Sequence, residues 1–78
     1  MVGKALKYMR KQKKIKQMDL IKILNIGQST LSDYENEKIS IEFSMLEKIA
    51  SICDYDIYFQ NRITQEKFKV DELERKDV

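Results

Sequence analysis

The feature that most constrains this chain is the helical spacing of its apolar residues over the first 53 positions. Four segments with this spacing predict helices, over about residues 3–13, 17–24, 28–36 and 41–53. Helices this short gain most of their stability by packing against one another. A chain of 78 residues holds them in one small bundle, and a second chain would add stability to so thin a core.

Each predicted helix has an apolar face that we expect to be buried. Ser40 is the expected N-cap of the fourth helix, because its hydroxyl could accept a hydrogen bond from a first-turn amide. Asn25 suits a tight turn between the second and third helices, since asparagine tolerates the left-handed conformation. The expected inward-facing residues are Ala5, Leu6, Met9, Leu20, Ile21, Leu24, Leu31, Tyr34, Phe43, Leu46, Ile49, Ala50 and Cys53.

Several absences from the sequence narrow the chemistry. The chain has no histidine, one cysteine and two glycines, which excludes histidine-based catalysis, a four-thiolate zinc site and a glycine-rich phosphate loop. We therefore expect no enzyme, no metal and no cofactor. The longest apolar run is three residues, 57–59, so we expect no membrane span. A lone cysteine cannot form an internal disulfide, and we expect a cytoplasmic protein.

Charge is distributed unevenly between the two halves of the chain. Residues 1–38 carry nine Lys or Arg and four Asp or Glu, whereas residues 39–78 carry six and nine. A basic first half favours a polyanionic partner. The alternative is that its lysines, which include a stripe at positions 4, 7, 11 and 14, only form a solvated helix face.

The third predicted helix carries a polar outer face that can bind base edges. Gln28, Ser29, Ser32, Asp33 and Asn36 follow the spacing of one helical face. The major groove of B-DNA admits one α-helix, where glutamine pairs with adenine and aspartate accepts from the cytosine amino group. Two short helices joined by a tight turn, the second with such a face, predict a helix-turn-helix.

The residues of this motif resemble those of a known family. The runs Gln-Met-Asp-Leu-Ile at 17–21 and Gly-Gln-Ser-Thr-Leu-Ser-Asp-Tyr-Glu-Asn at 27–36 resemble the lambdoid phage repressor and Cro group, the Xre-type regulators of bacteria. The resemblance covers about residues 3–54. It implies an all-α, four- to five-helix bundle, a lambda repressor-like DNA-binding domain over residues 1–54 with the recognition helix at 28–36. Residues 55–78 then form a C-terminal extension.

The resemblance also implies a role for individual residues. Gln17 is expected to bind a phosphate and to support Gln28. Arg10 and Glu35 match an ion pair that ties the first helix to the end of the third. The expected base-contacting residues are Gln28, Ser29, Thr30, Ser32 and Asp33. The expected phosphate-contacting residues are Gln17, Asn36, Lys38, Lys14 and Lys16.

Three positions depart from the family pattern. Ile21 stands where the family usually has alanine, because the second and third helices approach closely there. Asn25 and Glu37 stand where glycine is usual. These departures predict a shifted packing of the second helix and a different end to the third.

The C-terminal extension changes its periodicity. Residues 55–60 are aromatic and β-branched, which favours a strand, and residues 67–70 alternate in the same way. Residues 71–76 read alternatively as a frayed helix. We expect a dimer or partner interface here, because aromatic residues are enriched at interfaces. The expected interface residues are Tyr55, Ile57, Tyr58 and Phe59.

Two functions follow from these patterns. The first is a sequence-specific transcriptional regulator, a repressor, that binds double-stranded DNA at a near-palindromic operator as a homodimer. The alternative is an antitoxin or anti-factor whose C-terminal half, residues 56–78, binds a partner protein, with DNA binding as autoregulation. Pairing of an exposed strand with a partner is the expected mode in the second case.

Overall fold

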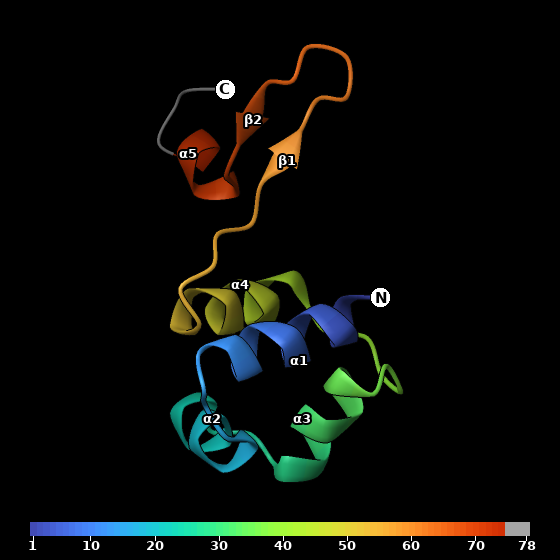
Figure 1. Cartoon of the computed structure of the whole chain (residues 1–78), viewed down its shortest axis with the longest axis vertical. Coiled ribbons are helices and arrows are strands. Elements are labelled where there is room, and N and C mark those ends of the chain that lie inside the picture. Colours follow the sequence, from blue (N-terminus) through green and yellow to red (C-terminus); the bar gives the residue numbers. More distant parts are fainter. Residues whose placement is uncertain (75–78) are drawn as a thin grey trace.

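A computed structural model of the chain shows a helical bundle followed by a small hairpin (Figure 1). The structure describes residues 1–74. The bundle consists of α1 (Val2–Gln12), α2 (Gln17–Leu24), α3 (Gln28–Glu35) and α4 (Phe43–Ile52). The strands β1 (Phe59–Gln60) and β2 (Lys67–Phe68) pair antiparallel, and α5 (Val70–Glu74) follows them. The predicted fold class, a small helical bundle with a short C-terminal strand, is confirmed.

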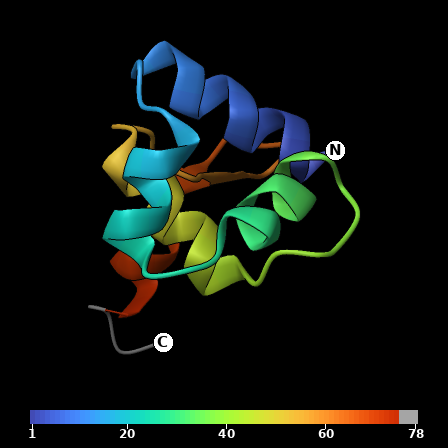
Figure 2. The ribbon, with the colours of Figure 1, turned by 90° about the horizontal axis from the view of Figure 1, so that it is seen from below.

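The helix-turn-helix and the hairpin lie at opposite ends of an elongated molecule. Its principal extents are 39 × 24 × 23 Å. In Figure 1, α2 and α3 lie below α1, whereas the hairpin rises above α4. Figure 2 views the molecule from the end that carries α2 and α3, with the hairpin behind. α1 packs against both α3 and α4, and α2 packs against α3.

The core is built from one large side chain of each helix in the bundle. Leu6, Leu20, Leu31 and Ile49 are fully buried, and Cys53 joins them directly after α4. Ile21 is half-buried and packs against this core, so the larger side chain is accommodated at its edge while α2 still contacts α3. Most of the predicted inward-facing residues are thus confirmed, although Ala5 is exposed.

The predicted start of the fourth helix is wrong by two residues. The N-cap of α4 is Glu42, with extended backbone dihedrals, so Ser40 does not cap it. The residues between α3 and α4 connect the two helices, and Ile41 in this connection packs against the buried cluster. The helix therefore begins after Ile41.

Phe43 faces the hairpin rather than the core. Its side chain is 40% exposed, and its ring stacks on Phe59 at a centroid distance of 6.2 Å. The ring of Phe59 stacks in turn on Phe68 at 5.7 Å. This aromatic row connects the bundle to the hairpin. The expectation that Phe43 is a core residue is wrong, because its ring packs against the hairpin instead.

The strand of residues 55–60 is shorter than predicted. Only Phe59 and Gln60 pair, with Phe68 and Lys67 respectively. The segment from Tyr55 to Tyr58 leads to the hairpin without regular pairing. The two readings of the last residues both apply in part, because Lys67–Phe68 is a strand and Val70–Glu74 is a helix; residues 75 and 76 of the predicted helix lie outside the described residues.

Each helix of the bundle ends in a left-handed residue that is not glycine. These residues have φ values of 62° at Lys14, 56° at Asn25, 61° at Glu37 and 66° at Asp54. The amide of the following residue closes each end on the carbonyl five positions back, at 2.8 Å for Tyr55 to Ala50 and 2.9 Å for Lys38 to Asp33. This is the Schellman arrangement, in which glycine is the usual left-handed residue.

The left-handed ends explain two departures from the family pattern. Asn25 and Glu37 adopt the conformation for which glycine is favoured, so the turn after α2 and the end of α3 keep the geometry without the glycine. The expectation that α3 ends differently because of Glu37 is wrong. The cost is strain, since a left-handed conformation is unfavourable by about 1–2 kcal/mol for an ordinary side chain.

We expect Lys14→Gly to stabilise the fold by about 1 kcal/mol, because it removes that strain at the end of α1. Thermal unfolding followed by circular dichroism measures the effect as a rise in melting temperature. Asn25→Gly is the matched control and should give a smaller gain, since asparagine tolerates the left-handed region better than lysine does. A lower melting temperature for Lys14→Gly would contradict the assignment of strain.

Candidate nucleic-acid interface

α3 separates a buried face from a polar outer face. Leu31 and Glu35 are buried, and Tyr34 packs against the core. Gln28, Ser29 and Asn36 are exposed, whereas Thr30, Ser32 and Asp33 are half-buried. The predicted base-contacting residues thus remain accessible along the helix.

The turn between α2 and α3 fixes the angle at which α3 is presented. Asn25 reverses the chain in the left-handed conformation, and Ile26 packs against the core as an anchor. Gly27 follows as the extended N-cap of α3, and its carbonyl accepts the amide of Leu31 at 3.2 Å. Burial of Leu20 and Leu31 holds the two helices together.

A buried ion pair joins α1 to the end of α3. The Arg10 guanidinium donates from Nε to Glu35 Oε2 at 2.7 Å and from a terminal nitrogen to Glu35 Oε1 at 3.0 Å. Its other terminal nitrogen donates to the carbonyl of Ile15 at 2.9 Å. Gln17 Nε2 completes the cluster by donating to Glu35 Oε1 at 3.0 Å. Bidentate pairing of this kind fixes orientation as well as charge.

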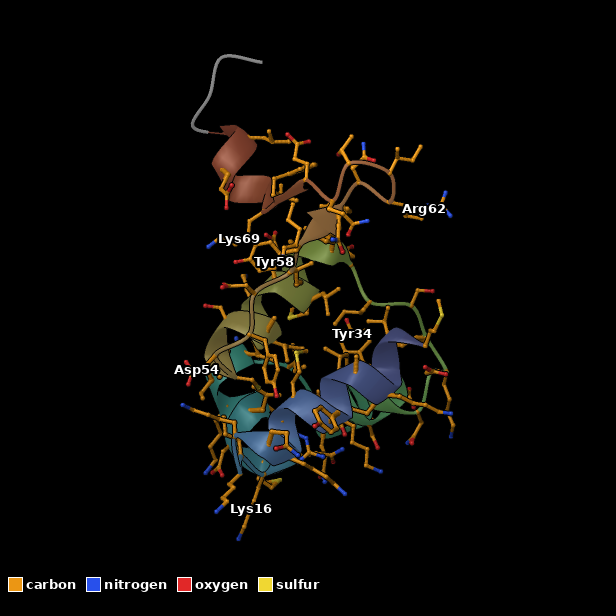
Figure 3. All side chains as sticks on the ribbon, turned by 45° about the horizontal axis from the view of Figure 1, so that its top comes forward. Lys16, Tyr34, Asp54, Tyr58, Arg62 and Lys69 are labelled. Carbon is orange, nitrogen blue, oxygen red and sulfur yellow. The ribbon has the colours of Figure 1, made fainter. Side chains whose placement is uncertain are left out.

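The network brings two distant segments of the chain together. Ile15 lies between Lys14 and Lys16 in the turn before α2, and Glu35 directly precedes Asn36. The Arg10 side chain is hydrogen-bonded to both segments. Four predicted phosphate-contacting residues are exposed and flank the pair α2 and α3 in sequence: Lys14 and Lys16 precede α2, and Asn36 and Lys38 follow α3. Lys16 projects from the end of the molecule opposite the hairpin (Figure 3).

Gln17 has a partner that its sequence position did not reveal. The side chain is half-buried, and its amide nitrogen is bound to Glu35 rather than to Gln28. The amide nitrogen carries two N–H donors, and one of them is bound to Glu35. The second N–H, together with the backbone amide at the start of α2, can donate to a phosphate.

Glu35 remains ionised despite its burial. Desolvation favours the neutral carboxyl, but hydrogen bonds from Arg10 and Gln17 and the charges of Arg10 and Lys7 favour the carboxylate, and the net effect lowers the pKa of Glu35. The folded state therefore binds this proton less tightly than the unfolded state, where the pKa has its ordinary value of 4.5. Ionised Glu35 stabilises the fold above that pH, and the stabilisation is lost as the pH falls through the lower pKa of the folded state.

We expect the free energy of unfolding to fall as the pH is lowered from about 5 to about 3. Urea unfolding at a series of pH values measures this as a falling midpoint. Glu35→Gln removes the titrating group, and its midpoint should fall less steeply over the same range, although the variant is less stable at neutral pH. Equal slopes for wild type and variant would show that Glu35 does not contribute.

Gly3 is a structural residue that sequence reasoning missed. It lies in the first turn of α1 and is buried against the end of α3. A Cβ atom at this position would overlap the carbonyl oxygen of Tyr34 and stand 2.9 Å from that of Glu35. A glycine inside an otherwise regular helix is unfavourable unless close packing requires it. Its presence at position 3 is the feature of the sequence that indicates this close packing.

An ion pair and a buried cysteine lie in the bundle away from α3. Lys13 pairs with Asp54, which connects the end of α1 to the end of α4, and the hydrogen bond that Lys13 donates to Asp54 raises the pKa of Lys13. Burial raises the pKa of the Cys53 thiol, so it packs as a small apolar residue. Over residues 1–74, no group of His, Cys, Asp and Glu gathers in a way that could hold a metal ion.

The predicted interface residues lie at the far end from the recognition helix. Tyr55, Tyr58 and Phe59 are 38%, 50% and 47% exposed, and Ile57 is half-buried. Figure 3 shows Tyr58 near the hairpin, well separated from Lys16. Among the described helices, none is long and apolar enough to cross a membrane.

Comparison with known proteins identifies the family. A family model described as helix-turn-helix matches residues 6–60, which is more than half of the chain and takes in α2, α3, α4 and most of α1. No curated protein and no solved structure matches the chain. The arrangement of α2 and α3 around a tight turn agrees with the matched model. The chain therefore belongs to the Xre-like, Cro-type helix-turn-helix family of DNA-binding transcription regulators.

Proposed function

We propose that this protein is a cytoplasmic repressor that binds a near-palindromic operator as a homodimer, with α3 in the major groove. Residues 1–54 serve as the DNA-binding domain, and residues 55–78 serve as the dimerisation element. Occupation of the operator then excludes the polymerase. Family membership supports DNA binding and regulation.

The observation that carries the proposal is the position of the Arg10–Glu35 network. It fixes the segment with Lys14 and Lys16 relative to the segment with Asn36 and Lys38, and α2 and α3 lie between these two segments in sequence. Contacts to phosphates set the register of a protein on DNA, and base contacts then provide specificity. A rigid connection between the two phosphate-binding segments gives α3 a defined depth and angle in the groove.

The side chains of α3 indicate which bases the recognition helix would prefer. Gln28, exposed in its first turn, is suited to the N6 and N7 groups of adenine, and Asp33 accepts from the cytosine amino group. Ser29 and Ser32 add hydroxyls that fit several base edges. Thr30 contacts the backbone or a thymine methyl group. Asp33 also repels phosphate, which disfavours binding out of register.

The location of the hairpin is compatible with a dimer that leaves α3 free. The exposed aromatic residues of the hairpin lie at the end of the molecule opposite α2 and α3 (Figure 1). To bind adjacent half-sites, a dimer joined through that end must place its two subunits side by side, with both recognition helices on a common side of the assembly. Half-sites about 34–36 Å apart, one turn of B-DNA, are the expected spacing.

Selection of bound duplexes from a random DNA pool at physiological salt tests the proposal. A symmetric motif with two half-sites about ten base pairs apart is the expected result. A non-symmetric motif would retain specific binding but contradict the homodimer. Salt-sensitive binding without any enriched motif would contradict sequence-specific regulation, because phosphate contacts alone bind every sequence.

Gln28→Ala should weaken binding by about 1–3 kcal/mol at one base pair of each half-site and relax specificity there. Binding to the selected site and to single-base variants of it measures this effect. Lys38→Ala is the matched comparison: it should weaken binding similarly on all sequences and reduce the salt slope by about one. Uniform losses for Gln28→Ala would contradict its assignment to a base.

A second function is favoured by the exposed aromatic residues of the hairpin. An antitoxin or anti-factor would bind a partner protein through residues 56–78, and its DNA binding would provide autoregulation. Tyr58 and Phe59 are about half exposed, as a docking surface requires. Deletion of residues 61–78 separates the candidates: loss of partner capture with half-site binding retained supports the antitoxin, and loss of dimerisation alone supports the repressor.

A further inference from the structure

A row of lysines on α1 has no partner within the described part of the chain. Lys4, Lys7 and Lys11 follow one another at intervals of three and four positions, so they lie along one face of the helix. We call these three residues the lysine stripe. All three side chains are exposed, and none of them takes part in an ion pair with a side chain that the structure describes.

Neighbouring carboxylates do not neutralise the lysine stripe. α1 contains no Asp or Glu, and the two glutamates at the end of α3 already have cations, since Glu35 is bound by Arg10 and Glu37 by the ammonium of Met1. Like charges one helical turn apart repel each other, and the helix dipole disfavours a cation in the first turn, where Lys4 stands. The stripe therefore lowers the stability of α1, and a bound polyanion would relieve that repulsion.

The lysine stripe borders the face by which α1 contacts the end of α3. Gly3 is buried in that contact, and Arg10 is bound to Glu35. Lys7 lies four positions after Gly3 and three before Arg10, so it is beside both on the helix surface. Burial raises the pKa of Glu35, and Lys7 is near enough to join the groups that lower it. The stripe thus runs alongside the end of the recognition helix.

The lysine stripe also faces away from α4, from which the hairpin rises (Figure 1). Leu6 and Met9 project from the other flank of α1, where they pack into the core that α1 shares with α4. In Figure 2, which views the molecule from the end that carries α2 and α3, α1 runs along one edge of these two helices. The stripe is therefore on the side of α1 that remains accessible when α3 meets DNA.

The position of the lysine stripe is continuous with the proposed DNA interface. It begins beside the end of α3, where Gly3 is buried, and it leads to Lys14 in the segment before α2. Ten residue positions separate Lys4 from Lys14, which corresponds to about 15 Å of helix. One strand of DNA carries a phosphate about every 3.4 Å along the duplex axis. A row of lysines this long can therefore accompany several phosphates.

We propose that the lysine stripe binds the phosphate backbone beside each half-site, as a third phosphate-contacting segment in addition to the segments before α2 and after α3. This inference rests on the proposed function, in which α3 enters the major groove. Lysine binds a phosphate as a point charge, so the stripe adds affinity and fixes orientation without reading bases. A merely solvated helix face, by contrast, would have no effect on DNA binding.

Replacement of all three lysines by glutamine tests the proposal. Glutamine is a good helix former and removes the repulsion, so the melting temperature of the triple variant should equal or exceed that of wild type. We expect the slope of log binding constant against log salt concentration to fall by about one for each lysine in each half-site. Fluorescence anisotropy with the selected duplex, between about 50 and 200 mM salt, measures this slope. A slope equal to that of wild type would overturn the proposal.

Single variants separate a phosphate contact from an effect of net charge. Lys7→Gln and Lys48→Gln remove the same charge, but Lys48 is an exposed residue of α4 that lies beside the hairpin segment. Lys7→Gln should lower the slope by about one in each half-site, whereas Lys48→Gln should leave it unchanged. Lys7→Arg keeps the charge and should retain the slope of wild type. Equal falls for Lys7→Gln and Lys48→Gln would contradict a contact at the stripe.

Duplexes with single ethylated phosphates locate the contact. Ethylation removes the charge of one phosphate, and binding of wild type should be weakened by ethylation at phosphates that flank each half-site. The triple glutamine variant should be insensitive at those flanking phosphates while it remains sensitive at the phosphates bound by the segments before α2 and after α3. The same interference pattern for both proteins would overturn the proposal.

Selection of DNA with the same proteins distinguishes a failure of this inference from a failure of the proposed function. A motif selected by wild type, with a salt slope that the triple variant does not change, overturns only the role of the stripe. Binding without an enriched motif, but with a slope that the triple variant lowers, overturns sequence-specific regulation and supports the stripe as a DNA contact. The same motif for wild type and variant, with a lower slope for the variant, supports both.

Discussion

Arg10→Ala is expected to lower the free energy of unfolding by about 3–5 kcal/mol, the cost of leaving a buried charge without its partner. Glu35 is 4% exposed and receives two hydrogen bonds from Arg10. The same substitution frees the Ile15 carbonyl, which Arg10 also binds. Small domains are stable by only about 5–15 kcal/mol in total, so this variant is expected to be close to unfolded at 37 °C.

Thermal and urea unfolding followed by circular dichroism measure this effect. Lys11→Ala, which removes a cation from the adjacent exposed position of α1, is the matched control and should change stability by less than about 0.5 kcal/mol. An Arg10→Ala protein with the melting temperature of wild type would contradict the structural role of the ion pair. Arg10 is buried behind α3, so the variant should lose stability before its base preferences change.

Gly3→Ala is expected to destabilise the fold by about 3 kcal/mol, at the upper end of the usual cost of overpacking. The added methyl group would meet the backbone carbonyls of Tyr34 and Glu35, and backbone atoms cannot rotate away as a side chain does. α1 must then separate from the end of α3, close to the Arg10–Glu35 pair. This loss outweighs the gain of about 1 kcal/mol that alanine normally has over glycine in a helix.

Gly27→Ala provides the matched control for Gly3→Ala. A Cβ atom at Gly27 would meet Thr30 and Ser29 only at 3.8 and 3.9 Å, which are ordinary contacts. Gly27 also has a φ of −75°, which any residue can adopt. Its substitution should cost about 0.5–1 kcal/mol through the weaker N-cap, well below the loss at Gly3. Similar losses at the two glycines would contradict the close approach of α1 and α3.

The helices and their inner faces were predictable because they depend on local periodicity. Each helix of the bundle has an apolar stripe at helical spacing, and one residue of each stripe is fully buried: Leu6, Leu20, Leu31 and Ile49. The helix-turn-helix was predictable for a similar reason, since its turn and its polar face lie within one continuous segment. Family membership agrees with that prediction.

The remaining features depend on contacts between residues that are far apart in sequence. Phe43 and Phe59 are sixteen positions apart, and a helical pattern cannot show that a phenylalanine of α4 faces a hairpin. The bond from Gln17 to Glu35 and the packing of Gly3 on Tyr34 are of the same kind. The hairpin ladder is two residues long on each strand, too short for alternation to define its limits.

The left-handed ends of the four helices have a consequence for how long each molecule survives in a cell. Strain at Lys14, Glu37 and Asp54 lowers the free energy that separates the native chain from the opened chain, and proteases cleave the opened chain. A regulator that is opened more often has a shorter lifetime. For the repressor proposed above, abundance would then follow the rate of synthesis closely, and a pause in synthesis would restore transcription without an inducer molecule.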